Sequence, residues 1–140
     1  MFFKSPRIEA EWNDPGLNTK LRQLVLEVAA FAQTKFDWEI FLTCVYRTPE
    51  ENFAITGIRD GVHTLWRAVD VRVRDRGPDE SLAVATFVND RWTYDQTRPM
   101  MRCALMEGAG PQSTGSHLHF QAHTNTRLTL APEASTIPPA

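Results

Sequence analysis

The sequence predicts an α+β fold in which helices pack on one face of a small antiparallel sheet. Two segments, 68–74 and 116–123, alternate apolar and polar residues with the period of a half-buried strand. Two other segments, 17–35 and the stretch after Gly77, repeat apolar residues at helical spacing. Helix, strand, strand, helix and strand follow one another along the chain, which is an α+β order.

The N-terminal part is expected to form one long helix and one buried strand. A turn signal at 13–16 precedes the helix, which should begin at Leu17 and end near Lys35. The first twelve residues are interpreted as an irregular arm. A strand is predicted over 38–46, which is rich in Ile, Phe, Leu, Val and Tyr, and 49–52 should open a short helix or turn.

The two alternating strands each have an apolar and a polar face. The apolar residues are Val69, Val71, Val73, Leu118, Phe120 and Ala122. The polar residues are Asp70, Arg72, Arg74, His117, His119, Gln121 and His123. We expect the apolar face to pack against the helices, which leaves the polar face to hold an aspartate beside several histidines.

A second helix and an ambiguous segment lie between these strands. Gly77 and Pro78 start the helix. Residues 98–110 are ambiguous, with a strand expected at 101–106 and a flexible, glycine-containing loop at 108–115.

The composition describes a soluble globular domain. The chain has 140 residues, of which 42% are hydrophobic and 23% charged, and we divide it into a single domain at 1–125 and a Pro-containing tail at 126–140. Its net charge of −2 argues against a nucleic-acid partner. No apolar run approaches about 18 residues, so no membrane span is expected. Cys44 and Cys103 are too few for a disulfide scaffold and are predicted to be reduced, with Cys44 in the core.

The histidines on the polar face suggest a metal site. Catalytic zinc is usually held by three side chains from His, Asp, Glu or Cys, with a fourth position left for water. His63 and Asp70 would supply two such ligands. Either His117 or His119 would supply the third, because alternate residues of a strand point the same way about 6.6–6.8 Å apart. The histidine that does not bind could then reach the water or the substrate.

Three pieces of sequence, in this order along the chain, carry a family resemblance. They are Tyr46-Arg47-Thr48, then His63-x6-Asp70 with Ala68 two residues before the aspartate, then His117-Leu118-His119-Phe120. Together they resemble the zinc peptidases of the D-Ala-D-Ala carboxypeptidase and L-alanyl-D-glutamate endopeptidase group, which is related to lysostaphin-type peptidases and to the hedgehog signalling domain. The chain length is similar to that of the small phage endolysins of this group.

The resemblance implies a fold, a chemistry and a site. The fold would be hedgehog-like, and zinc would be held by His63, Asp70 and His119. The neighbouring His117 would assist the water or the tetrahedral intermediate, and Arg47 would bind and polarise the substrate. The substrate would be the stem peptide of bacterial peptidoglycan, cut by an endo- or carboxypeptidase. Such an enzyme would be made in the cytoplasm without a signal peptide and released to the cell wall by a phage lysis system.

Several alternatives stay open. Many family members have a carboxylate base where this chain has Ser116, so a catalytically inactive, zinc-binding phage structural or interaction module is the second hypothesis. A metal-free interaction domain is the third. Trp66 would either wall a substrate subsite or pack in the core. Arg47 could instead pair with a nearby glutamate, Glu50 or Glu51. Arg72 and Arg74, which share the strand face of Asp70, would either attract an acidic peptide or be solvated.

Overall fold

A five-stranded sheet forms the centre of the fold in the computed structural model, which describes residues 1–108 and 116–129. The helices in these ranges are α1 (Pro6–Trp12), α2 (Thr19–Phe36), α3 (Pro49–Thr56) and α4 (Pro78–Arg91). The strands are β1 (Phe2–Phe3), β2 (Phe41–Cys44), β3 (Ala68–Arg72), β4 (Trp92–Thr93), β5 (Ala104–Glu107), β6 (His117–Gln121) and β7 (Arg127–Leu128). The predicted α+β class is confirmed.

The large sheet is mixed, where the sequence predicted an antiparallel one. Its strand order is β1-β2-β3-β6-β5, and every neighbouring pair is antiparallel except β1 and β2. The parallel pair arises because residues 2–3 form strand β1 beside β2. Helix α1 follows, so the expectation that the first twelve residues form an irregular arm was wrong. The N–H groups of Phe2 and Lys4 donate to the carbonyls of Ile40 and Leu42, which adds β1 to the edge of the sheet.

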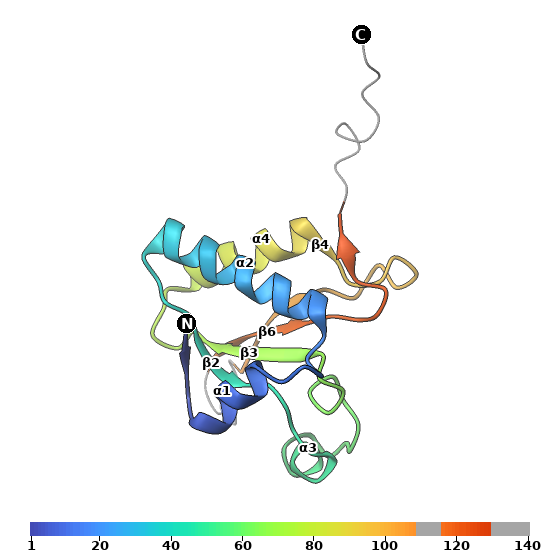
Figure 1. Cartoon of the computed structure of the whole chain (residues 1–140). Coiled ribbons are helices and arrows are strands. Elements are labelled where there is room, and N and C mark those ends of the chain that lie inside the picture. Colours follow the sequence, from blue (N-terminus) through green and yellow to red (C-terminus); the bar gives the residue numbers. More distant parts are fainter. Residues whose placement is uncertain (109–115, 130–140) are drawn as a thin grey trace.

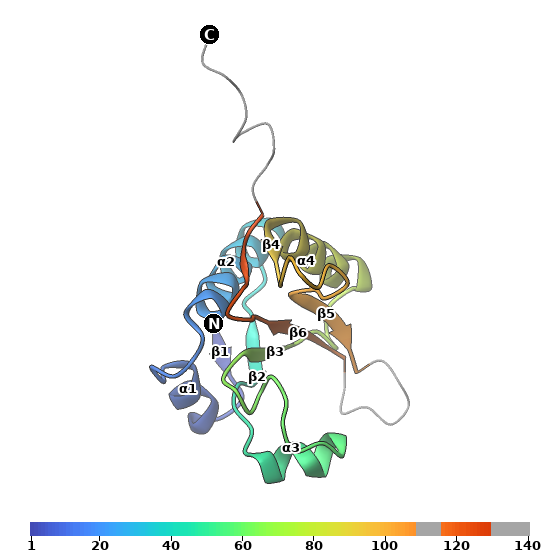
Figure 2. The ribbon, with the colours of Figure 1, turned by 90° about the vertical axis from the view of Figure 1, so that its right-hand side faces the viewer.

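The helices lie on both sides of the sheet. The long helices α2 and α4 cover one face together, while α1 and α3 lie on the opposite side (Figure 1, Figure 2). The prediction of helices on one face is therefore correct for the two long helices and wrong for the two short ones. The only buried residue of α3 is Asn52, so this helix has no apolar face with which to cover a sheet.

The alternation in β3 and β6 has the predicted consequence. All six apolar residues of the two patterns are buried in the core against the long helices. In the register of the pair, Val69 lies opposite Phe120, and Asp70 lies opposite His119. The polar face of the sheet therefore brings an aspartate and a histidine side by side.

The predicted boundaries are close to those observed. Helix α2 begins after Asn18, whose side chain accepts the N–H of Leu21, and ends at Asp37, which has a left-handed backbone with φ 53°. Residues 49–52, predicted to open a short helix or turn, begin helix α3. This helix starts with a capping box between Thr48 and Glu51.

The folded domain extends past the predicted boundary at residue 125. Strand β7 pairs with β4, and Thr126 is completely buried while its hydroxyl donates to the carbonyl of Tyr94. The remaining tail, 130–140, and most of the predicted loop, 109–115, lie outside the described residues. Within the described ranges, no helix is long and apolar enough to cross a membrane.

Candidate metal centre

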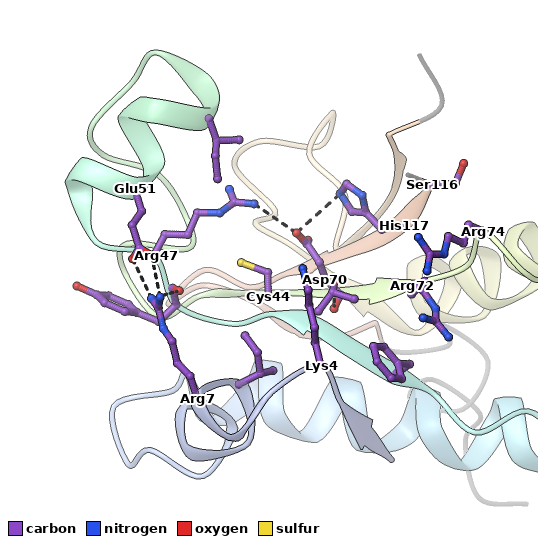
Figure 3. Close-up of a pocket in the computed structure, with 15 residues that line it drawn as sticks. Lys4, Arg7, Cys44, Arg47, Glu51, Asp70, Arg72, Arg74, Ser116 and His117 are labelled. Carbon is purple, nitrogen blue, oxygen red and sulfur yellow. Dashed lines mark hydrogen bonds and ion pairs between the residues drawn. The ribbon is translucent and has the colours of Figure 1, made fainter. Parts of the chain in front are cut away.

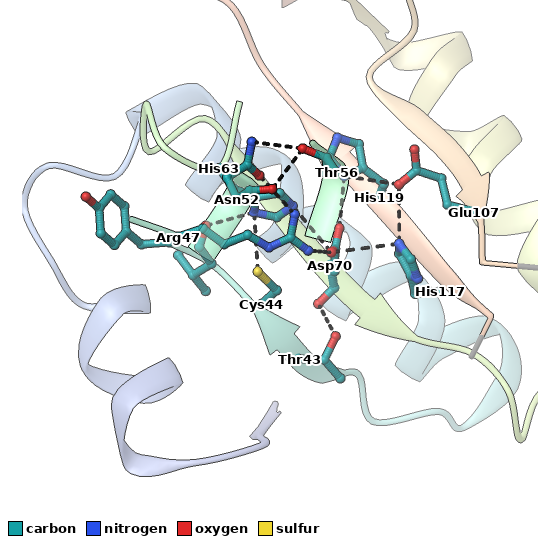
Figure 4. Close-up of polar contacts among 12 residues, drawn as sticks. Thr43, Cys44, Arg47, Asn52, Thr56, His63, Asp70, Glu107, His117 and His119 are labelled. Atoms are coloured by element: carbon teal, nitrogen blue, oxygen red, sulfur yellow. Dashed lines mark hydrogen bonds and ion pairs between the residues drawn. The ribbon is translucent and has the colours of Figure 1, made fainter. Parts of the chain in front are cut away.

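Asp70 lies at the centre of a cluster of basic side chains (Figure 4). Its Oδ1 is 2.9 Å from Nδ1 of His119, and its Oδ2 is 3.3 Å from Nε2 of His63. The same Oδ2 is 3.7 Å from Nη2 of Arg47 and 3.8 Å from Nε2 of His117. Four of the six residues predicted for the site thus face a fifth, Asp70.

The elements of the fold explain this convergence. Asp70 is in the middle of β3, and the antiparallel register places it directly opposite His119 on β6. His63 comes from the turn that precedes β3, and Arg47 follows the end of β2. The polar face of two adjacent strands and two flanking segments therefore supply the cluster.

The hydrogen bond of His63 determines which of its nitrogens faces the aspartate. Its Nδ1 lies 3.0 Å from the carbonyl oxygen of Val45, which can only accept, so this nitrogen carries the proton. The other nitrogen, Nε2, is buried, has no hydrogen-bond partner among the described residues, and faces Asp70. This nitrogen therefore faces the carboxylate as an N–H group when the ring is protonated and as a lone pair when the ring is neutral.

Gln121 fixes the ring of His119 in the same way. The amide nitrogen of Gln121 donates to the carbonyl of Arg102 at 2.8 Å, which turns the amide oxygen toward His119. That oxygen lies 3.0 Å from Nε2 of His119 and accepts its proton. The remaining Nδ1 faces Asp70.

Nε2 of His63 and Nδ1 of His119 thus each face one oxygen of Asp70, and either a ring proton or a metal cation could lie in each contact. Among the described residues, the groups of possible ligands whose atoms all lie within 4.8 Å of one another include His63 and Asp70 but not His119. Zinc takes imidazole nitrogen and carboxylate oxygen as ligands, and its histidines usually donate their second N–H to a carbonyl, carboxylate or water. His63 and His119 both follow this pattern, through Val45 and Gln121. The donor set fits zinc.

The pKa values of Asp70 and His63 show how protons are held in the cluster when no metal is bound. Burial alone would raise the pKa of Asp70, but hydrogen bonds from His119 and His63 lower it well below its usual range. Burial disfavours the charged form of His63, but Asp70 and Cys44 outweigh burial and raise the pKa of the imidazole to about 10. Metal binding must therefore displace a proton from His63.

A carboxylate that the sequence did not reveal completes the cluster. Glu107 on β5 lies opposite His117 in the strand pairing, and its Oε1 is 3.2 Å from Nε2 of His117 and 3.6 Å from Nδ1 of His119. The hydrogen bond from His117 lowers the pKa of Glu107. Ligand atoms of Asp70, Glu107 and His117 lie within 4.8 Å of one another. The sequence signal was weak because β5 lies in the segment whose pattern was ambiguous.

Cys44 belongs to the site. The sequence had suggested that it packs in the core, and that prediction was wrong. The pairing of β2 with β3 shifts between Leu42 and Cys44, so that Cys44 lies opposite Asp70. Such a bulge turns a side chain to the other face of a sheet. The Cys44 sulfur lies 3.5 Å from Nδ1 of His63, and ligand atoms of Cys44, His63 and Asp70 lie within 4.8 Å of one another.

Arg47 points into the site. Its Nη1 donates to Oδ1 of Asn52 at 3.4 Å, and its Nη2 forms the contact with Asp70. The alternative of a pair with Glu50 or Glu51 is not observed, since both glutamates bind other arginines. The half-buried guanidinium is thus available beside the metal ligands.

Two further candidates lie away from the cluster. Trp66 stacks on Tyr46 with ring centroids 4.4 Å apart, packs against the core, and is not among the residues that line the cavity described below. The half-buried His123 has its Nδ1 3.7 Å from Asp95. The structure therefore gives Trp66 a packing contact, and a contact of Trp66 with substrate remains a prediction.

A cavity of about 470 Å³ opens over Asp70 (Figure 3). Its walls come from α1, β2, α3, β3 and β6. The residues that line it are Lys4, Arg7, Ile8, Phe41, Thr43, Cys44, Tyr46, Arg47, Glu51, Ile55, Asp70, Arg72, Arg74, Ser116 and His117. This volume is within the range of about 300–1,000 Å³ that is typical of ligand-binding pockets.

Comparison of the chain with protein-family models, curated proteins and solved structures gave no match. The peptidase resemblance therefore depends on the residues of this chain alone.

Proposed function

We propose that this protein is a zinc-dependent peptidase that hydrolyses peptide bonds in the stem peptides of bacterial peptidoglycan. One observation carries the proposal: a ring nitrogen of His63 and one of His119 each face the buried carboxylate of Asp70, which lines a cavity of about 470 Å³. In this proposal His63, Asp70 and His119 hold the zinc ion. Open His and carboxylate zinc sites are typical of hydrolases.

The surrounding residues can supply the rest of the chemistry. Zinc in such a site is a Lewis acid that polarises the scissile carbonyl and lowers the pKa of water. Glu107 is placed to accept a proton from the attacking water and return it to the leaving amine. His117 holds Glu107 and can donate a hydrogen bond to the oxygen on which negative charge develops. Arg47 can orient the peptide through its carbonyl or a carboxylate.

The choice of substrate is supported by the sequence motifs. The peptidoglycan stem peptide comes from the resemblance of 46–48, 63–70 and 117–120 to cell-wall peptidases. In keeping with that resemblance, we propose that the enzyme reaches the wall through a phage lysis system.

Zinc content tests the first part of the proposal. Elemental analysis should find about one zinc ion per chain in the native protein and almost none in His119→Ala or Asp70→Ala. His123→Ala is the matched control, because His123 lies just past the end of β6 and contacts Asp95. A native protein that neither contains zinc nor takes it up would overturn the proposal.

Digestion of purified peptidoglycan tests the second part. The zinc-loaded protein should release new amino groups, and Asp70→Ala should release none. Zinc binding without any hydrolysis would instead identify an inactive zinc-binding module, the alternative that Ser116 in place of the usual carboxylate base suggests.

A further inference from the structure

The cavity has more positive charge than the metal site requires. Five of its fifteen lining residues are Lys or Arg and two are acidic, although the whole chain has a net charge of −2. Arg7 and Arg47 lie at the α3 end of the cavity (Figure 3). Arg72 and Arg74 lie at the opposite end, and Asp70 lies between the two groups. A substrate across the metal would thus meet cations on both sides.

The two arginines at the α3 end, Arg7 and Arg47, already bind other side chains of the protein. Arg7 binds Glu51 through 2.8 Å contacts and Glu11 through a 2.6 Å contact. Arg47 contacts Asp70 and Asn52. The cations that can still take a ligand therefore lie beside Asp70 and at the opposite end of the cavity (Figure 3).

The other three cations of the cavity lack strong partners: Lys4 lies beside Asp70, and Arg72 and Arg74 lie at the opposite end (Figure 3). Among the residues that the structure describes, neither Lys4 nor Arg74 forms an ion pair, and both side chains are exposed. Arg72 reaches only the exposed Asp75, at 3.5 Å, and its buried Nε has no hydrogen-bond partner within the described residues. The guanidinium lies 4.2 Å from the ring centroid of Phe41, which holds it in place.

The spacing along β3 relates this end to the metal. Arg72 is two residues after Asp70 on the same strand face, a separation of about 6.6–6.8 Å. An extended peptide covers the same distance in about two residues. A group bound by Arg72 would therefore belong to a residue within about two positions of the scissile carbonyl.

We propose that Lys4, Arg72 and Arg74 form a carboxylate subsite, which selects substrates with a free carboxylate within about two residues of the cleaved bond. The inference depends on the proposed function, since it names the substrate class of the same site. The partly buried, stacked Arg72 is the anchor, because a guanidinium can bind a carboxylate through two parallel hydrogen bonds. The flexible Lys4 and Arg74 add charge at the rim.

Two synthetic peptides test this proposal with the zinc-loaded protein. One is the stem pentapeptide L-Ala-γ-D-Glu-L-Lys-D-Ala-D-Ala, and the other differs only in having amides in place of its two free carboxylates, the α-carboxylate of the glutamate and the C-terminal carboxylate. A hydrogen bond to a charged group contributes about 1.5–3 kcal/mol, so the free acid should have a kcat/KM about 10- to 100-fold higher. Equal values for the two peptides would overturn the subsite.

Substitutions of Arg72 and Arg74 test whether these residues form the subsite. Arg72→Gln combined with Arg74→Gln should abolish the preference through a higher KM for the free acid, with little change for the amide. Arg74→Gln alone, at an exposed position, should reduce the preference even if the double variant folds poorly. Lys35→Gln, an exposed position on the long helix α2, is the matched control for charge. A preference that the double variant retains would refute the assignment.

A binding measurement separates this inference from the proposed function. If neither peptide is cut, calorimetric titration of both peptides still measures the subsite. Tighter binding of the free acid, lost in the double variant, would support the subsite and reject the peptidase. Equal affinity, or no binding of either peptide, would reject the subsite as well.

Discussion

Gln121 holds His119 in the orientation that a metal ligand needs. Its amide oxygen lies 3.0 Å from Nε2 of His119, and its amide nitrogen is tied to the backbone carbonyl of Arg102. The oxygen cannot turn away without loss of that second hydrogen bond. Nδ1 of His119 is therefore the nitrogen that faces Asp70, and Val45 has the corresponding effect on His63, whose Nε2 faces the same carboxylate.

Replacement of Gln121 should weaken metal binding although the residue is not a ligand. We expect Gln121→Leu to lower zinc affinity about 10- to 100-fold, the usual effect of losing a partner that orients a metal-bound histidine. Competition with a chromophoric chelator measures the affinity. Gln33→Leu, at an exposed site on α2, controls for the change of residue type. Unchanged affinity in folded Gln121→Leu would contradict the role given to this amide.

Glu107 should be needed for turnover and not for zinc. In the proposed mechanism this carboxylate only accepts and returns a proton, so Glu107→Gln should lower kcat about 10²- to 10⁴-fold while the zinc content stays at that of the native protein. Hydrolysis of the stem pentapeptide and elemental analysis give the two values. The exposed Glu9→Gln is the control. Loss of zinc in Glu107→Gln would instead make this residue a ligand.

Much of the site could be predicted from local pattern. The alternation of Val69, Asp70 and Val71 decided which side chains reach the core and which reach the cavity, and the same held for His117 and His119. Period-two patterns are reliable here because a one-residue slip would bury every charge. The approach of His117 and His119 to Asp70 then followed from the pairing of the two strands, whereas Arg47 and His63 come from flanking segments.

The remaining features of the site and fold depend on contacts between distant segments, which a local sequence pattern does not predict. Glu107 meets His117 through the pairing of β5 with β6, and no periodicity in β5 specified that register. Cys44 reaches Asp70 only because of the bulge in β2, which reverses the face that alternation predicts. The N-terminal strand β1 has only two residues, too few for a pattern to appear.

The two faces of β6 should respond differently to substitution. Leu118 is completely buried on the helix side of the strand, so Leu118→Ala should reduce the free energy of unfolding by about 2–5 kcal/mol. Its zinc content should not change, because the ligands are on the other face. Leu82→Ala, at a 58% exposed leucine of α4, should change the stability by less than about 0.5 kcal/mol. Denaturant titration gives both values. A similar loss in the two variants would show that the burial pattern is wrong.

The stability of the metal-free protein should be greatest in mildly acidic solution. The pKa of His63 rises from 6.5 in the unfolded chain to about 10 in the folded one, so its contribution is complete below pH 6.5 and disappears as the pH approaches 10. The pKa of Asp70 falls on folding, so its contribution is present above its ordinary pKa of 3.8 and is lost as the pH falls further. The melting temperature in a chelator should therefore be highest between about pH 4 and 6.5.

Zinc should reverse the alkaline part of this dependence. Because the metal displaces the proton of His63, the stabilisation that zinc adds should increase as the pH rises from 6 toward 8. Thermal melts with zinc and with a chelator, across the same series of buffers, measure the difference. Asp70→Asn removes the partner that raises the pKa of His63, so its chelator curve should lose the decline above pH 6.5. A native protein whose melting temperature in chelator rises from pH 6 to 9 would contradict the coupling between His63 and Asp70.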